Sequence, residues 1–489
     1  MLRNSIGSLS RFAVAAAMTA LLAACASTSG LSPQSSVREA GALAAQRALQ
    51  NTNVSDAAWP ATDWWKSFGD PQLDALIGEA LASSPMLDIA AARTRKALAE
   101  ADAAHSTLAP RIDANASSTR QRFSEHGLAP PPLGGSTQTF NVLQATLSWE
   151  IDFWGKNRSA YEAALGTARA AEVDAHAARL ALSTAIAQAY VGLERAYLQL
   201  DVAQATLAER EQIYALTRDR NAAGLDSRLE LKQAEAALPA TREQIAQLDE
   251  TIALARNQIA ALMGAGPDRG LAITRPMAVA QTTIALPSKL PAELIGRRPD
   301  VIAERWRIEA ASKDIASAKA EFYPNVNLLA FVGLQAFGGG NLLTAASRTV
   351  GIGPAITLPI FDAGQLRANL AGKDADYDIA VERYNQTLAD AMRDVVDQVV
   401  SLRSLAEQRK QQAMALTTAR EAYDLALLRY REGLGNYLQV LSAEQPLLVQ
   451  RSLDADLRAR GLTLSIDLVR ALGGGYEPSA TLAHVRTQQ

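Results

Sequence analysis

The sequence has one cysteine, few aromatic residues, few histidines and little net charge. Aromatic side chains make up 5% of the 489 residues, and the formal net charge is −3. A single cysteine excludes an intrachain disulfide framework and a thiolate metal cluster. The near-neutral charge gives no reason to expect a nucleic acid as partner. The histidines are scattered without the spacing of metal ligands: His105, His126, His176 and His484.

Motifs that carry enzymatic chemistry are also missing from the sequence. It contains no Gly-rich phosphate loop ending in Lys-Ser or Lys-Thr, which argues against nucleotide hydrolysis. Glu150 and Asp152 resemble a carboxylate pair, but no base, nucleophile or pocket signature accompanies them. We therefore expect a protein that is not an enzyme and that holds no cofactor and no metal.

The N-terminus reads as a secretory signal. Arg3 and Arg11 precede an apolar run over residues 12–22, and this run is too short to span a bilayer comfortably. The sequence Leu-Ala-Ala-Cys at residues 22–25 resembles a bacterial lipobox, in which Cys25 would receive a lipid and become the new N-terminus. An incidental cysteine beside an ordinary cleavage site is the alternative. Elsewhere no stretch approaches 18 consecutive apolar residues, so we expect no transmembrane helix.

Two long helical hairpins dominate the rest of the chain, over residues 155–264 and 364–473. In the first, apolar residues recur alternately four and three residues apart, as in a coiled coil: Leu182, Ile186, Ala189, Leu193, Ala196, Leu200, Ala203 and Leu207. The return arm, residues 231–262, keeps this spacing, so the arms can pack antiparallel. Each long arm would reach roughly 80 to 100 Å, so the hairpin should project and need neighbours.

The two hairpins are copies of one unit. Three glycine pairs at their starts, turns and ends all lie 209 residues apart: Gly155 and Gly364, Gly224 and Gly433, and Gly264 and Gly473. The second long arm is looser, because Arg409 falls in its apolar seam. A repeated unit that cannot bury its apolar face alone usually buries it against copies.

Before each hairpin, alternating apolar and polar residues predict a pair of strands. The expected strands are residues 111–123 and 143–151 in the first half, and 325–337 and 350–360 in the second. Each has about the 9 to 11 residues that a tilted membrane strand requires. Four strands cannot close a membrane barrel, so several chains must contribute. The alternation alone also fits a soluble β-sandwich; the lipobox and the hairpins favour the membrane.

Ahead of the first repeat, Asp70 can cap a helix that Pro71 opens. The adjacent Trp64 and Trp65 could form a ligand platform, but packing in a small core is the favoured interpretation.

Several short motifs give the chain a family resemblance. They are Phe68-Gly69-Asp70-Pro71, Arg298-Pro299-Asp300-Val301, Phe322-Tyr323-Pro324, the run from Leu358 to Gly364, and Tyr430-Arg431-Glu432-Gly433. With them the chain resembles the outer-membrane factors, the TolC-like channel family, and within it the NodT-type lipoprotein branch of tripartite drug-efflux systems. The resemblance covers nearly the whole mature chain. Ala26 after the cysteine, rather than Asp, is similar to lipoproteins delivered to the outer membrane.

The resemblance implies a mainly α fold with a membrane β-barrel. Each chain of a homotrimer would give four strands to a 12-strand barrel in the outer membrane of a Gram-negative bacterium, and long coiled-coil hairpins to an α-helical barrel in the periplasm. Substrates would pass passively from an inner-membrane pump, of RND type, and a periplasmic adaptor (membrane fusion) protein. The expected segments are a signal peptide (1–24), a lipid anchor, tether and N-terminal equatorial segment (25–85), repeat 1 (86–264), an equatorial connection (265–296), repeat 2 (297–473) and a C-terminal tail (474–489).

The hairpin turns would form the periplasmic tip. Their candidate gate and adaptor-docking residues are Arg218, Arg220, Gly224, Asp226, Arg228, Arg429, Tyr430, Arg431, Glu432 and Gly433. The resemblance implies salt bridges that hold the tip closed and a docking surface for the adaptor, whereas ordinary solvated turn charges are the alternative. Relatives often carry an aspartate ring here, but Gly435, Gln439 and Ser442 are not acidic. Asp226 is then the best candidate for an acidic gate ring.

Other functions fit parts of the sequence. A type I secretion exit duct would share the architecture and differ in its cargo. A lipid-anchored periplasmic coiled-coil adaptor would have one hairpin flanked by soluble β domains, not two hairpins interleaved with strand pairs. A lipid-anchored hydrolase would need the catalytic constellation that the sequence lacks.

Overall fold

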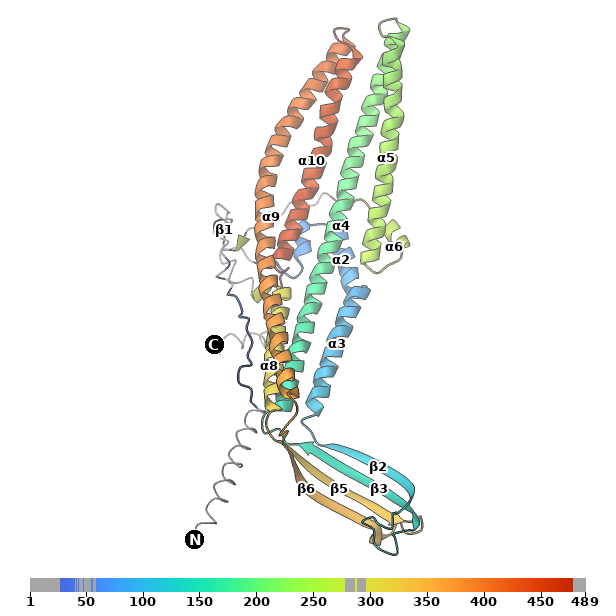
Figure 1. Ribbon diagram of the computed structural model, residues 1–489. Coiled ribbons are helices and arrows are strands. Elements are labelled where there is room, and N and C mark those ends of the chain that lie inside the picture. The colour runs from blue at the N-terminus through green and yellow to red at the C-terminus, as the bar shows by residue number, and fades with distance from the viewer. Residues whose placement is uncertain are drawn as a thin grey trace. The chain divides into compact units, whose positions relative to one another are not determined.

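The structure is a computed structural model, and it describes residues 27–39, 41, 43, 47, 54–55, 59–277, 286–287 and 296–477. The predicted signal peptide, the lipid-attachment residue Cys25, most of the connection after residue 277 and the tail beyond 477 lie outside the described residues. The chain divides into two compact units, each assembled from separate segments (Figure 1). The strand unit comprises residues 1–37, 93–171 and 304–384, and the hairpin unit comprises 38–92, 172–303 and 385–489.

The strand unit contains one antiparallel sheet of four strands in the order β2-β3-β5-β6. Their bounds are Arg111–Arg122 (β2), Thr137–Glu150 (β3), Asn325–Phe337 (β5) and Arg348–Thr357 (β6). The four predicted strands are confirmed, although β3 begins six residues earlier than expected. The last strand ends at Thr357 rather than residue 360. Two residues later, Pro359 has no N–H to donate to a neighbouring strand.

The register gathers apolar residues on one face of this sheet. Leu147 lies opposite Ile112 on one side and Ala330 on the other, and Ala330 lies opposite Ile352. Within the chain this face is largely uncovered, since Ile112 is 70% exposed and Ile352 is 77% exposed. The sheet therefore presents a continuous apolar surface across all four strands.

A helix of 22 residues precedes each strand pair: α3 (Pro85–Ser106) before β2 and α8 (Pro299–Ala320) before β5. By length and composition, the stretch Pro71–Ser106 passes for a membrane-crossing helix. The structure divides it at Ser84 into α2 (Pro71–Ser83) and α3. Because α2 has only 13 residues and α3 carries charges along its length, neither offers an unbroken apolar span.

The repeat is reproduced residue for residue in the hairpins. Helices α4 (Lys156–Ala222) and α9 (Gln365–Arg431) both have 67 residues, and α5 (Arg228–Leu262) and α10 (Tyr437–Ala471) both have 35. Subtracting the start of α4 from that of α9, or the start of α5 from that of α10, gives 209. For α8 and α3 the same subtraction gives 214, so the two halves differ by five residues in the segments that contain the strands.

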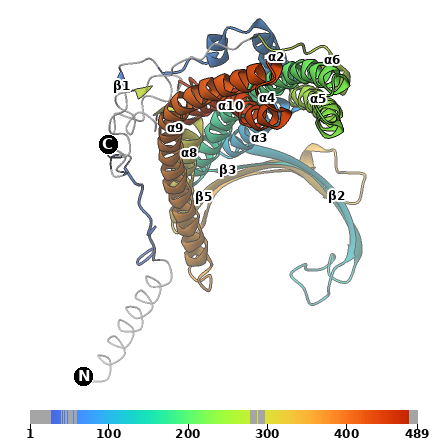
Figure 2. The same ribbon diagram turned by 90° about the horizontal axis from the view of Figure 1, so that it is seen from above.

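Within the hairpin unit the four long helices form a row in the order α9-α10-α4-α5 (Figures 1 and 2). Gln412 of α9 donates to the carbonyl of Gln450 on α10, and Arg210 of α4 donates to Thr241 of α5, both at 2.8 Å. Arg210 also pairs with Glu444 of α10. Helices α9 and α5 are thus the two ends of the row.

The largest core of the hairpin unit joins α4, α5 and α10 to the short N-terminal helices. Trp64 and Trp65 belong to this core, with 4% and 5% of their surface exposed, which agrees with a packing role. Asp70 caps α2 by accepting from the backbone N–H of Gln72 at 2.8 Å, as expected, and also accepts from the Tyr190 hydroxyl at 2.7 Å.

Candidate functional site at the hairpin turns

The two hairpin turns have the same backbone geometry. Gly224 and Gly433 adopt φ of 74° and 73°, the left-handed region that glycine tolerates best. In each turn the following residue donates back to the last helical turn, Leu225 to the carbonyl of Arg220 at 2.9 Å and Leu434 to that of Arg429 at 2.8 Å. This is a Schellman-type helix end. Both glycines are therefore turn residues with a backbone role.

Asp226 follows the first turn, and only 6% of its side chain is exposed. Its carboxylate accepts from Nε and Nη2 of Arg220 at 2.9 and 3.3 Å. It also accepts from the Tyr430 hydroxyl at 2.6 Å. Since Tyr430 belongs to α9, the Asp226 carboxylate joins the turn of the first hairpin to the second hairpin.

Tyr430 is the residue on which these contacts converge, and none of its surface is exposed. Its hydroxyl lies 2.8 Å from the Thr217 hydroxyl, and its carbonyl accepts from Arg220 at 3.1 Å. The Arg220 guanidinium lies over the tyrosine ring, 4.6 Å from its centre. Burial, and then the hydrogen bond to Asp226, raise the pKa of Tyr430 to about 12. We call Thr217, Arg220, Asp226 and Tyr430 the tip cluster.

The other predicted tip residues point outward. Arg218 pairs with the adjacent Asp219 at 3.1 Å, and Arg429 donates to the Leu434 carbonyl at 3.3 Å. Arg228, Arg431 and Glu432 are exposed and form no ion pair within the part of the chain that the structure describes. The ten predicted residues thus separate into an internal cluster, two turn glycines and a charged outer rim.

A ladder of polar pairs between α4 and α10 was not predicted from the sequence. Its most buried member is Arg210–Glu444, a bidentate pair with contacts of 2.8 and 3.1 Å. The others are Glu209–Arg451, Asp456 with Arg195 and Gln199, and Gln188–Asp467. Arg210 lies three residues after Leu207, at the next position of the apolar seam. A charged residue at a seam position was the sequence signal that could have indicated this buried pair.

Where the strands meet the helices, aromatic side chains remain accessible. Trp154, after β3, stacks on Tyr323 with ring centres 4.7 Å apart, and its indole N–H donates to the Pro324 carbonyl at 2.9 Å. Both rings are 52% exposed. Tryptophan and tyrosine in this setting are typical of the boundary between a membrane and water.

The contacts at the turns join helices to one another. Among the described residues no three potential metal ligands come together. The buried polar groups at the turns are paired with one another, an arrangement that holds helices in place.

Comparison with known proteins shows which family this chain resembles. The family model for outer membrane efflux proteins matches residues 76–265 and 290–474. Fusaric acid resistance protein FusA of Burkholderia cepacia is 42% identical over 364 residues, which are 73% of this chain and 68% of that protein. Multidrug resistance outer membrane protein MdtP of Escherichia coli is 34% identical over 433 residues, 87% of this chain and 88% of that protein. The crystal structure of the outer membrane protein VceC from Vibrio cholerae superposes with a TM-score of 0.81 at 37% identity, covering 86% of this chain and all of that one.

Proposed function

Since the chain belongs to the outer membrane efflux protein family and is an outer-membrane efflux channel, we propose that three copies assemble into one continuous conduit. Each copy contributes its sheet to a shared 12-strand membrane barrel and its two hairpins to a helical barrel in the periplasm. Substrates pass through this conduit passively, driven by an inner-membrane pump.

The open sheet of the strand unit carries this proposal. Its strands have 12, 14, 13 and 10 residues, enough to cross a tilted membrane path. One strand at each edge, β2 and β6, pairs on one side only. Unpaired backbone groups in hydrocarbon cost several kcal/mol each, so the edges must be closed by other copies.

The tip cluster acts as a clasp between the two hairpins of one chain. Opening the tip separates Tyr430 of α9 from Thr217, Arg220 and Asp226 of the first hairpin. The exposed rim, with Arg218, Arg228, Arg431 and Glu432, provides the surface on which a periplasmic adaptor docks. The inner-membrane pump that works with this adaptor is of RND type. Because the similar proteins named above confer resistance to fusaric acid and to multiple drugs, the cargo we propose is small, organic and toxic.

A lipid on Cys25 would anchor the chain at the inner face of the outer membrane. In support, the segment after it is held beside the start of α9: Arg367 donates to the backbone carbonyls of Ser27 and Ser29, the latter at 3.2 Å. Arg367 follows the end of β6 by ten residues. Incorporation of labelled palmitate, lost in Cys25→Ser, tests the anchor.

Purified protein in planar bilayers tests the conduit. We expect discrete single-channel currents from a species that migrates as a trimer on gels and dissociates on heating. A monomer that passes no ions would overturn the proposal. Export of a fluorescent drug, compared with export of a peptide toxin in cells that lack the native channel, separates efflux from type I secretion.

A further inference from the structure

A cavity of about 750 Å³ lies in the hairpin unit, where α10 ends and α8 begins, between α4 and α9. Small apolar side chains of α4 line one part of it, among them Ala177, Ala178 and Ala181. Polar side chains of α9 and α10 line another part: Arg393, Asp394, Gln398, Asp467 and Arg470. Sites for small organic ligands typically measure roughly 300 to 1,000 Å³. We call this space the junction cavity.

A buried arginine fixes the wall of the junction cavity beside α8. Arg298 is 9% exposed, and its guanidinium donates to both carboxylate oxygens of Asp300, at 3.0 and 2.6 Å. Its remaining nitrogen donates to Asp394 at 3.3 Å and to the carbonyl of Ala471, the last residue of α10, at 3.4 Å. Arg298 thus joins α8, α9 and α10 around a preformed cavity.

Most charged groups of the lining are paired within the chain. Arg393 donates to Asp394 at 3.0 Å, and Asp467 accepts from Gln188 at 2.6 Å. The exception is Arg470, whose guanidinium forms no hydrogen bond or ion pair within the part of the chain that the structure describes. A guanidinium presents five N–H donors in a planar fork that matches a carboxylate. Arg470 can therefore take an anionic partner.

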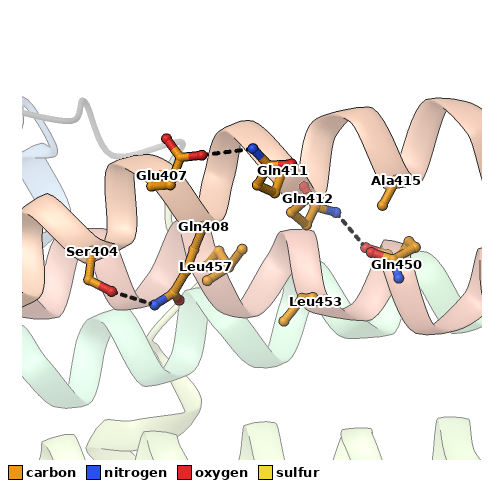
Figure 3. Close-up of a pocket in the computed structure, with 9 residues that line it drawn as sticks. All are labelled: Ser404, Glu407, Gln408, Gln411, Gln412, Ala415, Gln450, Leu453 and Leu457. Carbon is orange, nitrogen blue, oxygen red and sulfur yellow. Dashed lines mark hydrogen bonds between the residues drawn. The ribbon is translucent and has the colours of Figure 1, made fainter.

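A second polar group of the lining is also unpaired. The side-chain oxygen of Gln398 is buried and has no hydrogen-bond partner among the described residues. Amides in the groove between α9 and α10 nearer the hairpin turn are paired instead (Figure 3): Gln411 donates to Glu407 at 2.7 Å, and Gln412 donates to the carbonyl of Gln450 at 2.8 Å. Because buried polar groups are nearly always paired, the Gln398 oxygen is an acceptor available to a ligand.

The first half of the chain shows that the fold does not require these two groups. The equivalent of Gln398, 209 residues earlier, is Ala189, which is 9% exposed and belongs to the largest core. The equivalent of Arg470 is Ala261. Both return helices nevertheless have 35 residues, and two residues after each end comes a glycine with positive φ. The same helix end is thus built with alanine at both positions.

We propose that the junction cavity binds a small organic acid. Its carboxylate pairs with the Arg470 guanidinium, and a hydroxyl or N–H group of the same molecule donates to the Gln398 side-chain oxygen. Its apolar part lies against the alanines of α4. Binding requires only the folded chain, whereas the role of the acid as cargo rests on the proposed efflux function and deepens it by naming a cargo class.

Three naphthalene compounds separate the two polar contacts in equilibrium dialysis. The sample is the full-length protein in nanodiscs, with empty nanodiscs as background. The compound 6-hydroxy-2-naphthoate has both the carboxylate and the donor, 6-methoxy-2-naphthoate lacks the donor, and 6-hydroxy-2-naphthamide lacks the carboxylate. We expect the hydroxynaphthoate to bind most tightly of the three.

Two substitutions assign the contacts to residues. Arg470→Ala should weaken binding of both naphthoates about tenfold or more and leave binding of the naphthamide nearly unchanged, because only the charge-assisted contact is lost. Gln398→Ala should weaken binding of the two hydroxyl compounds alone, by about two- to tenfold. Both variants carry the residue of the first half, so they should fold. Arg458→Ala removes an exposed arginine paired with Asp454 on the same helix and should bind all three compounds as wild type does.

The outcomes separate this inference from the proposed function. Binding of the hydroxynaphthoate no stronger than to empty nanodiscs refutes the site. Equal losses in Arg470→Ala and Arg458→Ala, or equal losses for naphthoates and naphthamide in Arg470→Ala, refute its assignment.

Export from cells tests the cargo role. Wild type should export the hydroxynaphthoate, and Arg470→Ala should slow this export while export of a cationic dye stays unchanged. Equal export of the acid by both proteins removes the cargo role. If wild type exports neither compound, the proposed function fails, whereas the binding result stands on its own.

Discussion

Replacing Tyr430 by phenylalanine should loosen the closed tip while leaving its packing intact. The hydroxyl makes two of the hydrogen bonds that join the hairpins in the tip cluster, to Asp226 at 2.6 Å and to Thr217 at 2.8 Å. The third, from Arg220 to the Tyr430 carbonyl, survives the substitution. The ion pair between Arg220 and Asp226 also survives, but both residues belong to the first hairpin, so it does not hold the second.

The expected magnitude follows from the two bonds lost. A hydrogen bond to a charged group contributes about 1.5 to 3 kcal/mol and a neutral one about 0.5 to 1.5 kcal/mol, so the loss is about 2 to 4.5 kcal/mol per chain. At 1.4 kcal/mol per factor of ten, the ratio of open to closed tips should rise roughly 30- to 1600-fold. Planar-bilayer recordings should show a higher mean conductance or longer open times in Tyr430→Phe, and Asp226→Ala should act in the same direction.

Tyr437 provides a matched control for this measurement. It is 4% exposed and packs in the same apolar cluster as Tyr430. Its hydroxyl makes no hydrogen bond within the part of the chain that the structure describes. Tyr437→Phe should therefore leave the conductance unchanged. Equal conductance in wild type and Tyr430→Phe would refute the role of the tip cluster in closure.

Three further predictions concern other parts of the molecule. Glu444→Ala leaves Arg210 buried without its partner and should destabilise the protein by about 3 to 5 kcal/mol. The control is Glu235→Ala, at the exposed equivalent position of the first hairpin, which should cost about 0 to 1 kcal/mol. Equal melting temperatures for the two variants would contradict this prediction. A side chain at Gly351 would place its Cβ 2.5 Å from the Phe331 ring, while a side chain at Gly353 would meet open space. Gly351→Val should therefore reduce the amount of heat-modifiable trimer, and a second substitution, Phe331→Ala, should restore it. Gly353→Val is the control and should be tolerated. Burial raises the pKa of Asp467 above 3.8, so the free energy of unfolding should fall as pH rises from about 3.8 through the higher folded-state pKa. In Asp467→Asn the free energy of unfolding should change less with pH over that window. An unchanged pH profile in this variant would exclude Asp467 as the cause of the pH dependence.

The elements of this fold were largely predictable because their signals are periodic. The glycine pairs fixed the ends of both hairpins, and the alternation of Leu143 to Ile151 fixed a strand. Strand ends were less certain: β3 continues back to Thr137 because it pairs with β2 as far as Arg122, and pairing is a property of two segments rather than of one.

The candidate site was predictable only in part. Asp226 stood out because the equivalent positions after Gly433 lack acids. Arg220 and Tyr430 were also among the candidates, but their contacts with Asp226 were not predicted. Thr217 was missed altogether, because it lies 213 residues from Tyr430 and meets it only when the hairpins pack. The Arg210–Glu444 pair was missed for the same reason: the position of Arg210 in the apolar seam marks it as unusual, but its partner lies 234 residues away on another helix.

The constant offset of 209 residues through both hairpins, against 214 for the helices before the strands, shows which lengths the molecule can vary. The segments with the loops and strands tolerated a change of five residues between the halves. The arms did not, because in the proposed conduit both hairpins have to end at the same level. Extending the conduit by one heptad, about 10 Å, would thus require simultaneous insertions in all four long helices. An insertion in one arm alone would shift its seam out of step with its neighbours.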